Sequence, residues 1–227
     1  MLTSSRTGYV GVSADEICGA IHKALIALPM LSSPKDVPFL DGLYFFYEEG
    51  EASRHAPQGR IVRVGNHPRS QGSLRRRINQ HYSGRKNGSA FRKLLGGALL
   101  RSRAPESACL LPGPGKGHWE RQYAKPCDVC RTVEEEVSTI LRQSFRFRCV
   151  MVRDRVERNE LEAALIGALS HCSVCGPSPA WLGRYAYSHA VRCSGLWNSE
   201  FVGHSMADAQ LERFQQLVTS SAEFWRK

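Results

Sequence analysis

The chain has 227 residues, with 42% hydrophobic and 23% charged residues, which is the ordinary composition of a folded globular protein rather than a disordered one. This length suits one main domain with extensions. The formal net charge is +10, from 31 Lys and Arg against 21 Asp and Glu, so nucleic acid is the first partner to consider. A basic protein without such a ligand remains the alternative.

The N-terminal region has neither the pattern of a signal peptide nor that of a membrane span. Asp15 and Glu16 precede its apolar stretch, and the longest uncharged apolar run, 24–32, is interrupted by Pro29. We therefore expect a cytoplasmic protein that does not interact with membranes. Its eight cysteines are then expected to be thiols or metal ligands rather than disulfides.

The first predicted element is a helix over residues 14–27. Ser13 and Glu16 have the spacing of a capping box, in which each side chain satisfies a backbone N–H at a helix start. Apolar residues then recur every three or four positions, and Pro29 ends the helix. We expect residues 1–38 to form a helical extension packed on the main domain.

Two strands are predicted next. Residues 42–47 are mostly aromatic, and residues 60–65 are rich in β-branched side chains. The intervening segment, 48–59, is charged and contains glycine and proline, so an antiparallel hairpin with a long loop is the simplest connection.

The rest of the chain alternates helical patterns with a third strand. An α/β (α+β) fold follows, in which helices flank a small, mainly antiparallel three-stranded sheet. We expect a main domain over 39–190 with an inserted loop near 103–130, and a tail with a helix over 191–227. The predicted elements are helices over 73–82, 90–100, 133–143, 157–169 and 207–224, and a strand over 145–152.

The order of several short motifs resembles that of the GIY-YIG nuclease superfamily. The first two motifs stand here as Gly42-Leu43-Tyr44 and Arg63-Val64-Gly65, and a helix with Arg77 and His81 and a later helix with Glu162 follow. A bacterial group with Ile-Val-Arg-Val-Gly, Trp-Leu-Gly-Arg-Tyr and Ser-Gly-Leu-Trp-Asn motifs is more similar still. The resemblance covers residues 34–202, and its strength lies in the motif order.

The resemblance implies hydrolysis of DNA phosphodiester bonds with one Mg²⁺ (or Mn²⁺) ion. Tyr44 would activate water, Arg77 would contact the phosphate and Glu162 would hold the metal. Each residue type suits its role, since arginine offers a planar charged fork and a carboxylate supplies the oxygen that Mg²⁺ prefers. A free tyrosine has a pKa of about 10, so Tyr44 needs a partner, for which His81 is the candidate.

Other interpretations of these residues stay open. Tyr44 could be a half-buried strand aromatic, Arg77 could be a solvated arginine, and His81 could be a surface histidine. Glu162 is one of several acidic residues near a helix start, where acidic side chains are favoured anyway. Glu157 is the reserve candidate for the metal ligand.

The second motif departs from the family pattern. Arg63 replaces the second tyrosine, and Asn66 and His67 follow Gly65 where a lysine is frequent in the superfamily. A catalytically degenerate nucleic-acid-binding module is therefore the alternative function. In either case Arg63 and His67 are candidates to bind nucleic acid.

A basic cluster surrounds the arginine helix and the loop after it. These side chains could contact the DNA backbone, or they could form a solvated basic face. The candidates are Arg75, Arg76, Arg85 and Lys86, with Arg92 and Lys93 beside them.

Two Cys-x-x-Cys pairs indicate a possible structural Zn²⁺ site. Cys127 and Cys130 form the first pair, and Cys172 and Cys175 form the second. Four thiolates would satisfy tetrahedral zinc if folding brought the pairs together, and unliganded thiols are the alternative. A zinc-bound interaction protein is thus a third hypothesis for function. Tryptophans in the tail, at 181, 197 and 225, could stack on bases, but anchoring of the tail is the favoured interpretation.

Overall fold

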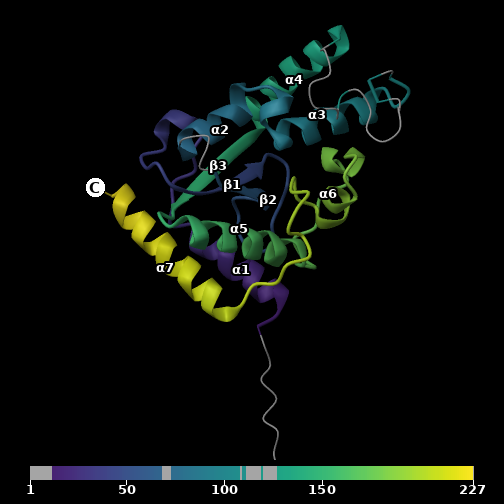
Figure 1. Ribbon diagram of the computed structural model, residues 1–227. Helices are drawn as coiled ribbons and strands as arrows, with labels where there is room; N and C mark the ends of the chain where they lie inside the picture. Colours follow the sequence, from purple (N-terminus) through teal and green to yellow (C-terminus); the bar gives the residue numbers. More distant parts are fainter. Residues whose placement is uncertain (1–11, 68–72, 108, 111–118, 120–126, 227) are drawn as a thin grey trace, which may run out of the picture.

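In the computed structural model, a three-stranded antiparallel sheet lies between two layers of helices (Figure 1). The structure describes residues 12–67, 73–107, 109–110, 119 and 127–226. The strands are β1 (Gly42–Glu48), β2 (Ile61–Gly65) and β3 (Phe145–Met151), and β1 lies in the middle. The predicted mixed fold with a small sheet is confirmed.

One face of the sheet is covered by α2 (Leu74–Ser83), α3 (Ala90–Arg103) and α4 (Asp128–Ser144). Successive side chains of a strand point to opposite faces. Tyr44 and Phe46 of β1 accordingly join the core on this side, together with buried residues of all three helices. The catalytic tyrosine expected from the sequence therefore faces the helix that carries Arg77.

The opposite face of the sheet is covered by α1 (Ala14–Leu25), α5 (Arg155–Ser170) and α7 (Asp208–Trp225). Helices α1 and α7, the first and last of the described chain, thus pack on the same face of the sheet and share the hydrophobic core on that side (Figure 1). The short helix α6 (His189–Ser194) and the 3₁₀ turns η1 (Pro34–Asp36), η3 (Lys86–Gly88) and η4 (Leu182–Tyr185) complete the described elements.

Side-chain caps fix where the main helices begin. The capping box at Ser13 and Glu16 is present at α1, as predicted. Ser73 caps α2 by accepting from the N–H of Arg76, and Asp154 caps α5 by accepting from the N–H of Glu157 at 2.8 Å. A cap sets the rotation of the residues after it, so these two side chains help to orient Arg77 and Glu162.

Some elements differ from the sequence prediction. The fourth helix begins at Asp128, not at residue 133, because the Cys127 thiol accepts from the N–H of Cys130 at its N-cap. Helix α6 was not predicted, since its six residues are too short for a periodic pattern. Most of the expected insertion near 103–130 lies outside the described residues. None of the helices that the structure describes is long and apolar enough to cross a membrane.

The segment after α6 closes the outer edge of β2. The N–H of Trp197 donates to the carbonyl of Val62 at 2.6 Å. The Asn198 side chain accepts from the N–H of Val64 at 3.1 Å and donates to its carbonyl at 2.9 Å, as a neighbouring strand would. Trp181 and Trp197 are buried, and both indoles donate to the carboxylate of Glu48. These two tryptophans anchor the tail, as predicted from the sequence.

Candidate active site

A polar cavity of about 200 Å³ lies where β1 begins and β2 ends. It brings together side chains from the sheet, from both helical layers and from the segment after α6. Three expected catalytic residues, Tyr44, Arg77 and Glu162, line it from β1, α2 and α5. The other lining residues are Arg63, Asn66, Ala90, Ile166, Asn198, Ser199, Glu200 and Phe201.

A buried chain of hydrogen bonds supports Tyr44. Its hydroxyl lies 2.8 Å from Nε2 of His81, and Nδ1 of His81 lies 2.7 Å from the hydroxyl of Ser89. Burial, together with the positive charges of nearby arginines, lowers the pKa of His81 well below its usual range. The imidazole is therefore neutral at physiological pH. With its proton on Nδ1, it donates to Ser89 and accepts the hydrogen bond of the Tyr44 hydroxyl.

Gly65 makes room for the Tyr44 ring. The two residues are paired across β1 and β2. A Cβ atom at position 65 would lie 2.2 Å from the Tyr44 hydroxyl oxygen and 2.3 Å from Cζ. The final glycine of the second motif is thus required by the tyrosine of the first, because only glycine lets the phenol cross the neighbouring strand.

Glu162 is a carboxylate in a confined position. Its Oε1 accepts from the backbone N–H of Asn66 at 3.0 Å, and it forms no salt bridge with any residue that the structure describes. Burial raises the pKa of Glu162, while the charges of Arg63 and Arg77 and the Asn66 N–H oppose this effect. A half-buried carboxylate that forms no ion pair with a described residue is well suited to hold a metal cation.

Two arginines bring positive charge to the same cavity. Nη1 of Arg77 donates to the carbonyl of Gly88 at 2.9 Å and to Gln80 at 3.1 Å, which fixes the side chain. Arg63 is 8% exposed, donates from Nη1 to the carbonyl of Trp197, and lies 5.1 Å above the Phe91 ring. Its Nε is buried without a hydrogen-bond partner among the described residues. An anion in the cavity would meet both guanidinium groups.

Comparison with protein families matches residues 23–224 to the GIY-YIG domain. The chain belongs to the GIY-YIG family. The match contains all three strands and every residue that lines the cavity. Neither a curated protein nor a solved structure matches the chain. The resemblance noted in the sequence is thus confirmed, and the general function that this family indicates is that of a nuclease acting on nucleic acid.

The reserve metal ligand, Glu157, lies outside the cavity of the GIY-YIG domain. Its carboxylate forms an ion pair of 2.6 Å with Arg213 of α7. Glu162 lies farther along α5 and on the side that faces β2. Of the two acidic residues, only Glu162 is placed among the other candidate catalytic residues.

The basic candidates of the GIY-YIG domain fall into two groups. Arg75, Arg76 and Arg85 are exposed, although Arg75 also donates to the carbonyl of Val37 at 2.6 Å. His67 and Lys86, which are also candidates to bind nucleic acid, are buried. His67 lies 3.1 Å from Asp41, and the Lys86 ammonium lies 5.5 Å from the centre of the Trp119 ring.

Arg92 belongs to the basic cluster in the sequence. In the structure it is buried and supports the catalytic cavity from within the core. It forms an ion pair of 2.8 Å with Glu134 of α4. Its Nη1 donates to the carbonyl of His81 at 2.9 Å. Ser89 could not be predicted, because its contact with His81 has no sequence signature, and neither could Glu200 and Phe201 at the cavity wall. Phe201 has a φ of 65°, which bulky residues rarely adopt.

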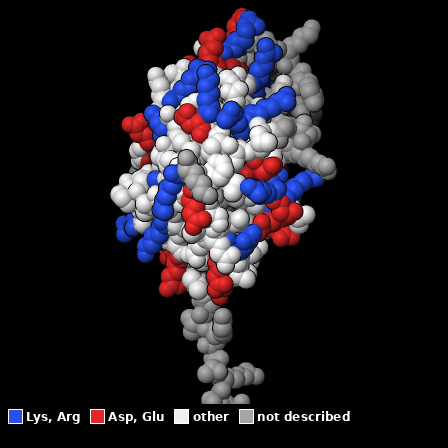
Figure 2. Space-filling model, turned by 90° about the vertical axis from the view of Figure 1, so that its left-hand side faces the viewer, with Lys and Arg blue, Asp and Glu red and all other residues white. Residues whose placement is uncertain are grey.

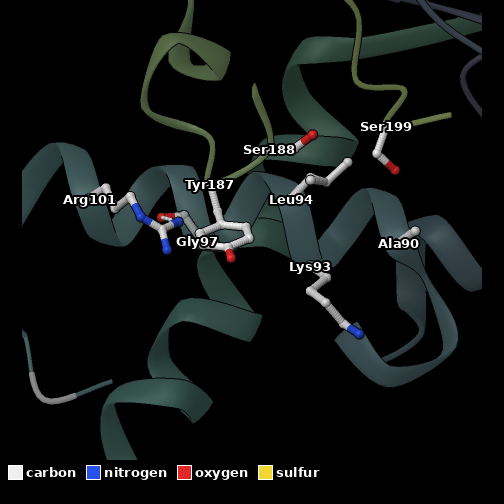
Figure 3. A pocket seen from close by; sticks show the side chains of 8 residues that line it. All are labelled: Ala90, Lys93, Leu94, Gly97, Arg101, Tyr187, Ser188 and Ser199. Atoms are coloured by element: carbon white, nitrogen blue, oxygen red, sulfur yellow. Dashed lines mark hydrogen bonds between the residues drawn. The ribbon is translucent and has the colours of Figure 1, made fainter. Parts of the chain in front are cut away.

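A second cavity, of about 280 Å³, adjoins the first, and the two share Ala90 and Ser199 (Figure 3). Lys93 and Arg101 of α3 and the exposed ring of Tyr187 line it, and the Arg101 guanidinium lies 5.3 Å from the centre of that ring. On the face drawn in Figure 2, Lys and Arg side chains are most numerous toward the end where the layer of α2, α3 and α4 lies in Figure 1.

The expected four-cysteine zinc site is not formed, because the two Cys-x-x-Cys pairs lie on opposite sides of the sheet. Cys127 and Cys130 contact the core beneath α4, and Cys172 and Cys175 contact the core beneath α1 and α5. The interpretation in which both Cys-x-x-Cys pairs bind one zinc ion is therefore wrong. Each pair instead lies in its own cluster of potential metal ligands.

Proposed function

We propose that this protein is an endonuclease that hydrolyses DNA phosphodiester bonds with one divalent cation, Mg²⁺ or Mn²⁺. The observation that carries the proposal is the meeting of Tyr44, Arg77 and Glu162 in one small polar cavity. These residues come from three different elements, and they supply a base, a cation and a carboxylate. Metal-dependent phosphodiester hydrolysis can use all three, for proton transfer, for stabilisation of negative charge and for metal binding.

Glu162 would hold the cation. Its carboxylate offers hard oxygen ligands, and Glu200 lines the same cavity. Mg²⁺ commonly uses one or two protein carboxylates and fills its other positions with water and phosphate oxygens, so the donors present fit this ion. When bound, the cation would polarise the phosphoryl group and lower the pKa of water.

Tyr44 would act as the general base. A water molecule attacks phosphorus and forms a new P–O bond while the P–O bond to the leaving strand breaks. The water proton passes to the Tyr44 oxygen as the Tyr44 hydroxyl proton moves to Nε2 of His81, and the leaving oxygen takes a proton from solvent. Because the pKa of His81 is low, the proton then returns from Nε2 to the Tyr44 oxygen, which passes a proton to water in the cavity, and the resting state is restored.

Arg63 and Arg77 would bind the non-bridging oxygens of the reacting phosphate. Both guanidinium groups line the cavity, and arginine pairs with phosphate through two parallel hydrogen bonds. The arginine in the second motif thus replaces a tyrosine hydroxyl with a phosphate contact. This role is compatible with activity, and it accounts for the buried Nε of Arg63.

The DNA strand would continue from the catalytic cavity into the neighbouring one. Lys93 and Arg101 would contact its backbone, and the exposed Tyr187 ring offers a surface on which a base can stack. Arg76 and Arg85 are exposed and would bind more distant phosphates. We infer DNA in the cytoplasm as the substrate, in keeping with eight free cysteines.

A nucleic-acid-binding module without catalysis is the second candidate function, and the replacement of the motif tyrosine by Arg63 favours it. Incubation of the purified protein with supercoiled plasmid in Mg²⁺ or in EDTA separates the two. The nuclease proposal predicts nicked or linear DNA in Mg²⁺ alone and DNA binding in both. Binding without cleavage in Mg²⁺ and in Mn²⁺ would favour the second candidate.

A further inference from the structure

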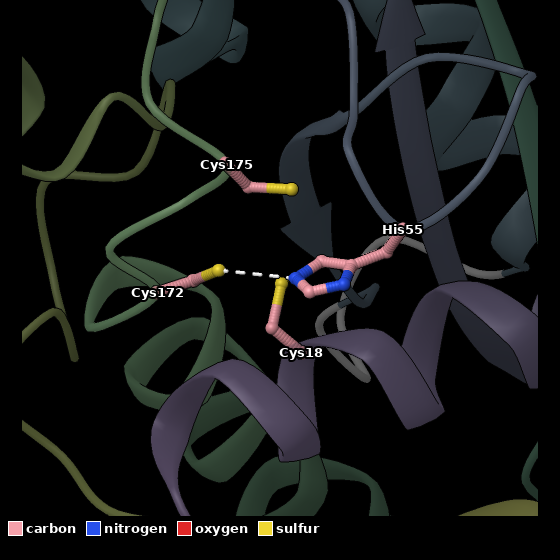
Figure 4. A group of neighbouring side chains, drawn as sticks. All are labelled: Cys18, His55, Cys172 and Cys175. Carbon is pink, nitrogen blue, oxygen red and sulfur yellow. Dashed lines mark hydrogen bonds between the residues drawn. The ribbon is translucent and has the colours of Figure 1, made fainter.

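Four side chains from three separate segments meet near the loop that joins β1 to β2. This loop lies at the opposite end of the hairpin from the catalytic cavity. Cys18 lies on α1, His55 lies in the loop between β1 and β2, and Cys172 and Cys175 follow α5 (Figure 4). Figure 4 shows the three thiols and the imidazole pointing toward one another. One ligand atom of each residue lies within 4.8 Å of the ligand atoms of the others.

This spacing is close to that of a tetrahedral zinc site. Zn–S bonds of about 2.3 Å give sulfur–sulfur edges of about 3.8 Å in a regular tetrahedron. Nε2 of His55 already lies 3.4 Å from the Cys172 sulfur. Small side-chain rotations would therefore bring all four ligand atoms to bonding distance of one ion.

The surroundings hold the four ligands in place. Asp15 of α1 accepts from both the backbone N–H and the hydroxyl of Ser173, each at 2.7 Å, and so fixes the Cys-x-x-Cys loop against the helix. The Ser53 hydroxyl lies 3.1 Å from the Cys175 sulfur and accepts from the N–H of His55. Polar partners of this kind orient metal ligands in known sites.

Gly19 gives the imidazole its position. A Cβ atom there would lie 3.1 Å from Nδ1 of His55, so a larger residue on α1 would press the ring away from the thiols. The helix thus supplies both a ligand, Cys18, and the space beside it for a second one.

We propose that Cys18, His55, Cys172 and Cys175 bind one Zn²⁺ ion as a closed structural site. Three thiolates and one imidazole are the donor set that tetrahedral zinc prefers, and four protein ligands leave no position open for substrate. Cys18 is fully buried. The ion joins α1 to the hairpin loop and to the end of α5. It therefore stabilises the layer of α1, α5 and α7 and takes no part in the nuclease reaction.

The test is the zinc content of protein expressed with zinc and purified without chelator. Comparison of wild type with a Cys172→Ser/Cys175→Ser variant is expected to show one zinc ion fewer per chain in the variant, together with a lower melting temperature. Cys193→Ser is the matched control, because Cys193 is exposed and outside both clusters. Equal zinc content in wild type and the double variant, or wild type without zinc, would overturn the proposal.

The other thiol cluster is measured separately, so that its metal is not mistaken for this one. Cys109, Cys127 and Cys130 have sulfur atoms 3.1 to 3.6 Å apart. A Cys127→Ser/Cys130→Ser variant reports any metal held there.

A second variant keeps the test decisive if the double variant does not fold. After replacement of zinc by Co²⁺, His55→Cys is expected to keep a tetrahedral spectrum and to gain thiolate-to-cobalt charge-transfer intensity. An unchanged spectrum in His55→Cys would exclude His55 as a ligand, and a spectrum without thiolate charge transfer in wild type would exclude the site.

Discussion

The Tyr44 hydroxyl is the only part of that side chain that the proposed chemistry uses. Replacement of Tyr44 by Phe keeps the ring in the core and removes the proton-transferring oxygen. General-base catalysis contributes roughly 10²–10⁴-fold to rates, so we expect a loss of cleavage rate in that range. The variant also leaves Nε2 of His81 without its partner, which costs roughly 1–3 kcal/mol of stability.

Tyr47→Phe is the matched control for this prediction. Tyr47 lies on the same strand, is equally buried, and faces the opposite core. It is expected to cleave at the wild-type rate in a single-turnover assay. Equal rates for Tyr44→Phe and Tyr47→Phe would show that the Tyr44 hydroxyl has no part in the reaction.

The buried His81 gives the stability of the protein a dependence on pH. Its pKa in the folded state lies well below its usual range, whereas an unfolded histidine titrates near about 6.5. Below that pH the unfolded chain binds a proton that the folded chain does not. The free energy of unfolding therefore falls as the pH falls, by up to about 1.4 kcal/mol per pH unit, and the histidine has no effect at higher pH.

Urea denaturation of wild type and His81→Gln between about pH 7.5 and pH 5 tests this dependence. The variant is expected to lose less stability than wild type over that range, whatever its stability at neutral pH. A parallel decline in both proteins would mean that the folded His81 takes up a proton as readily as the unfolded one.

Single residues were predictable from the sequence to different degrees. Tyr44, Arg77 and Glu162 were identified through the order of motifs, and they line one cavity. The roles of Ser89 and of the Asn66 backbone N–H could not be predicted from the sequence. Almost every residue supplies a backbone N–H, and serine side chains occur in many structural roles. The burial of His67 and Lys86 could not be predicted, because polar and charged residue types are exposed on average and these two lie against local partners.

At the scale of elements, the hairpin of β1 and β2 sets the position of Tyr44, the proposed general base. Replacement of Gly65 by Ala would place a methyl group 2.2 Å from the Tyr44 oxygen. The ring or the strand must then shift, which disturbs the contact between Tyr44 and His81, and a displacement of about 1 Å can cost roughly 10²-fold in rate. Overpacking is also expected to lower stability by about 1–3 kcal/mol.

Gly203→Ala serves as the comparison, since a Cβ at position 203 meets nothing within 4 Å. Cleavage rates and chemical denaturation of both variants measure the two effects. Full activity in Gly65→Ala would contradict the account of why the second motif ends in glycine.

The strands and capped helices could be predicted because their signals are local. Alternating or aromatic runs mark β1 and β2, and the box at Ser13 marks the start of α1. The grouping of the cysteines could not be predicted, because it depends on the face of the sheet to which each helix packs. Helix α4 lies on one face and α5 lies on the other, so the pairs that these helices carry are separated.

At the scale of the whole molecule, the two helical layers supply different residues to the catalytic cavity. The layer of α2, α3 and α4 supplies Arg77, His81 and the basic side chains, whereas the layer of α1, α5 and α7 supplies Glu162. The sheet holds Tyr44 between the layers. We propose that α1 and α7, which lie in the extensions expected over 1–38 and 191–227, belong to this unit, since both helices share the core under α5.

The central claim is that the cavity at Tyr44 is a metal-dependent nuclease centre with Glu162 as its metal ligand. Single-turnover cleavage of DNA in Mg²⁺ by Glu162→Gln and by Glu160→Gln tests it most directly, because Glu160 is an exposed carboxylate on the same helix, outside the cavity. We predict a loss of roughly 100-fold or more for Glu162→Gln, with DNA binding retained, and the wild-type rate for Glu160→Gln. Cleavage at the wild-type rate by folded Glu162→Gln would contradict the account.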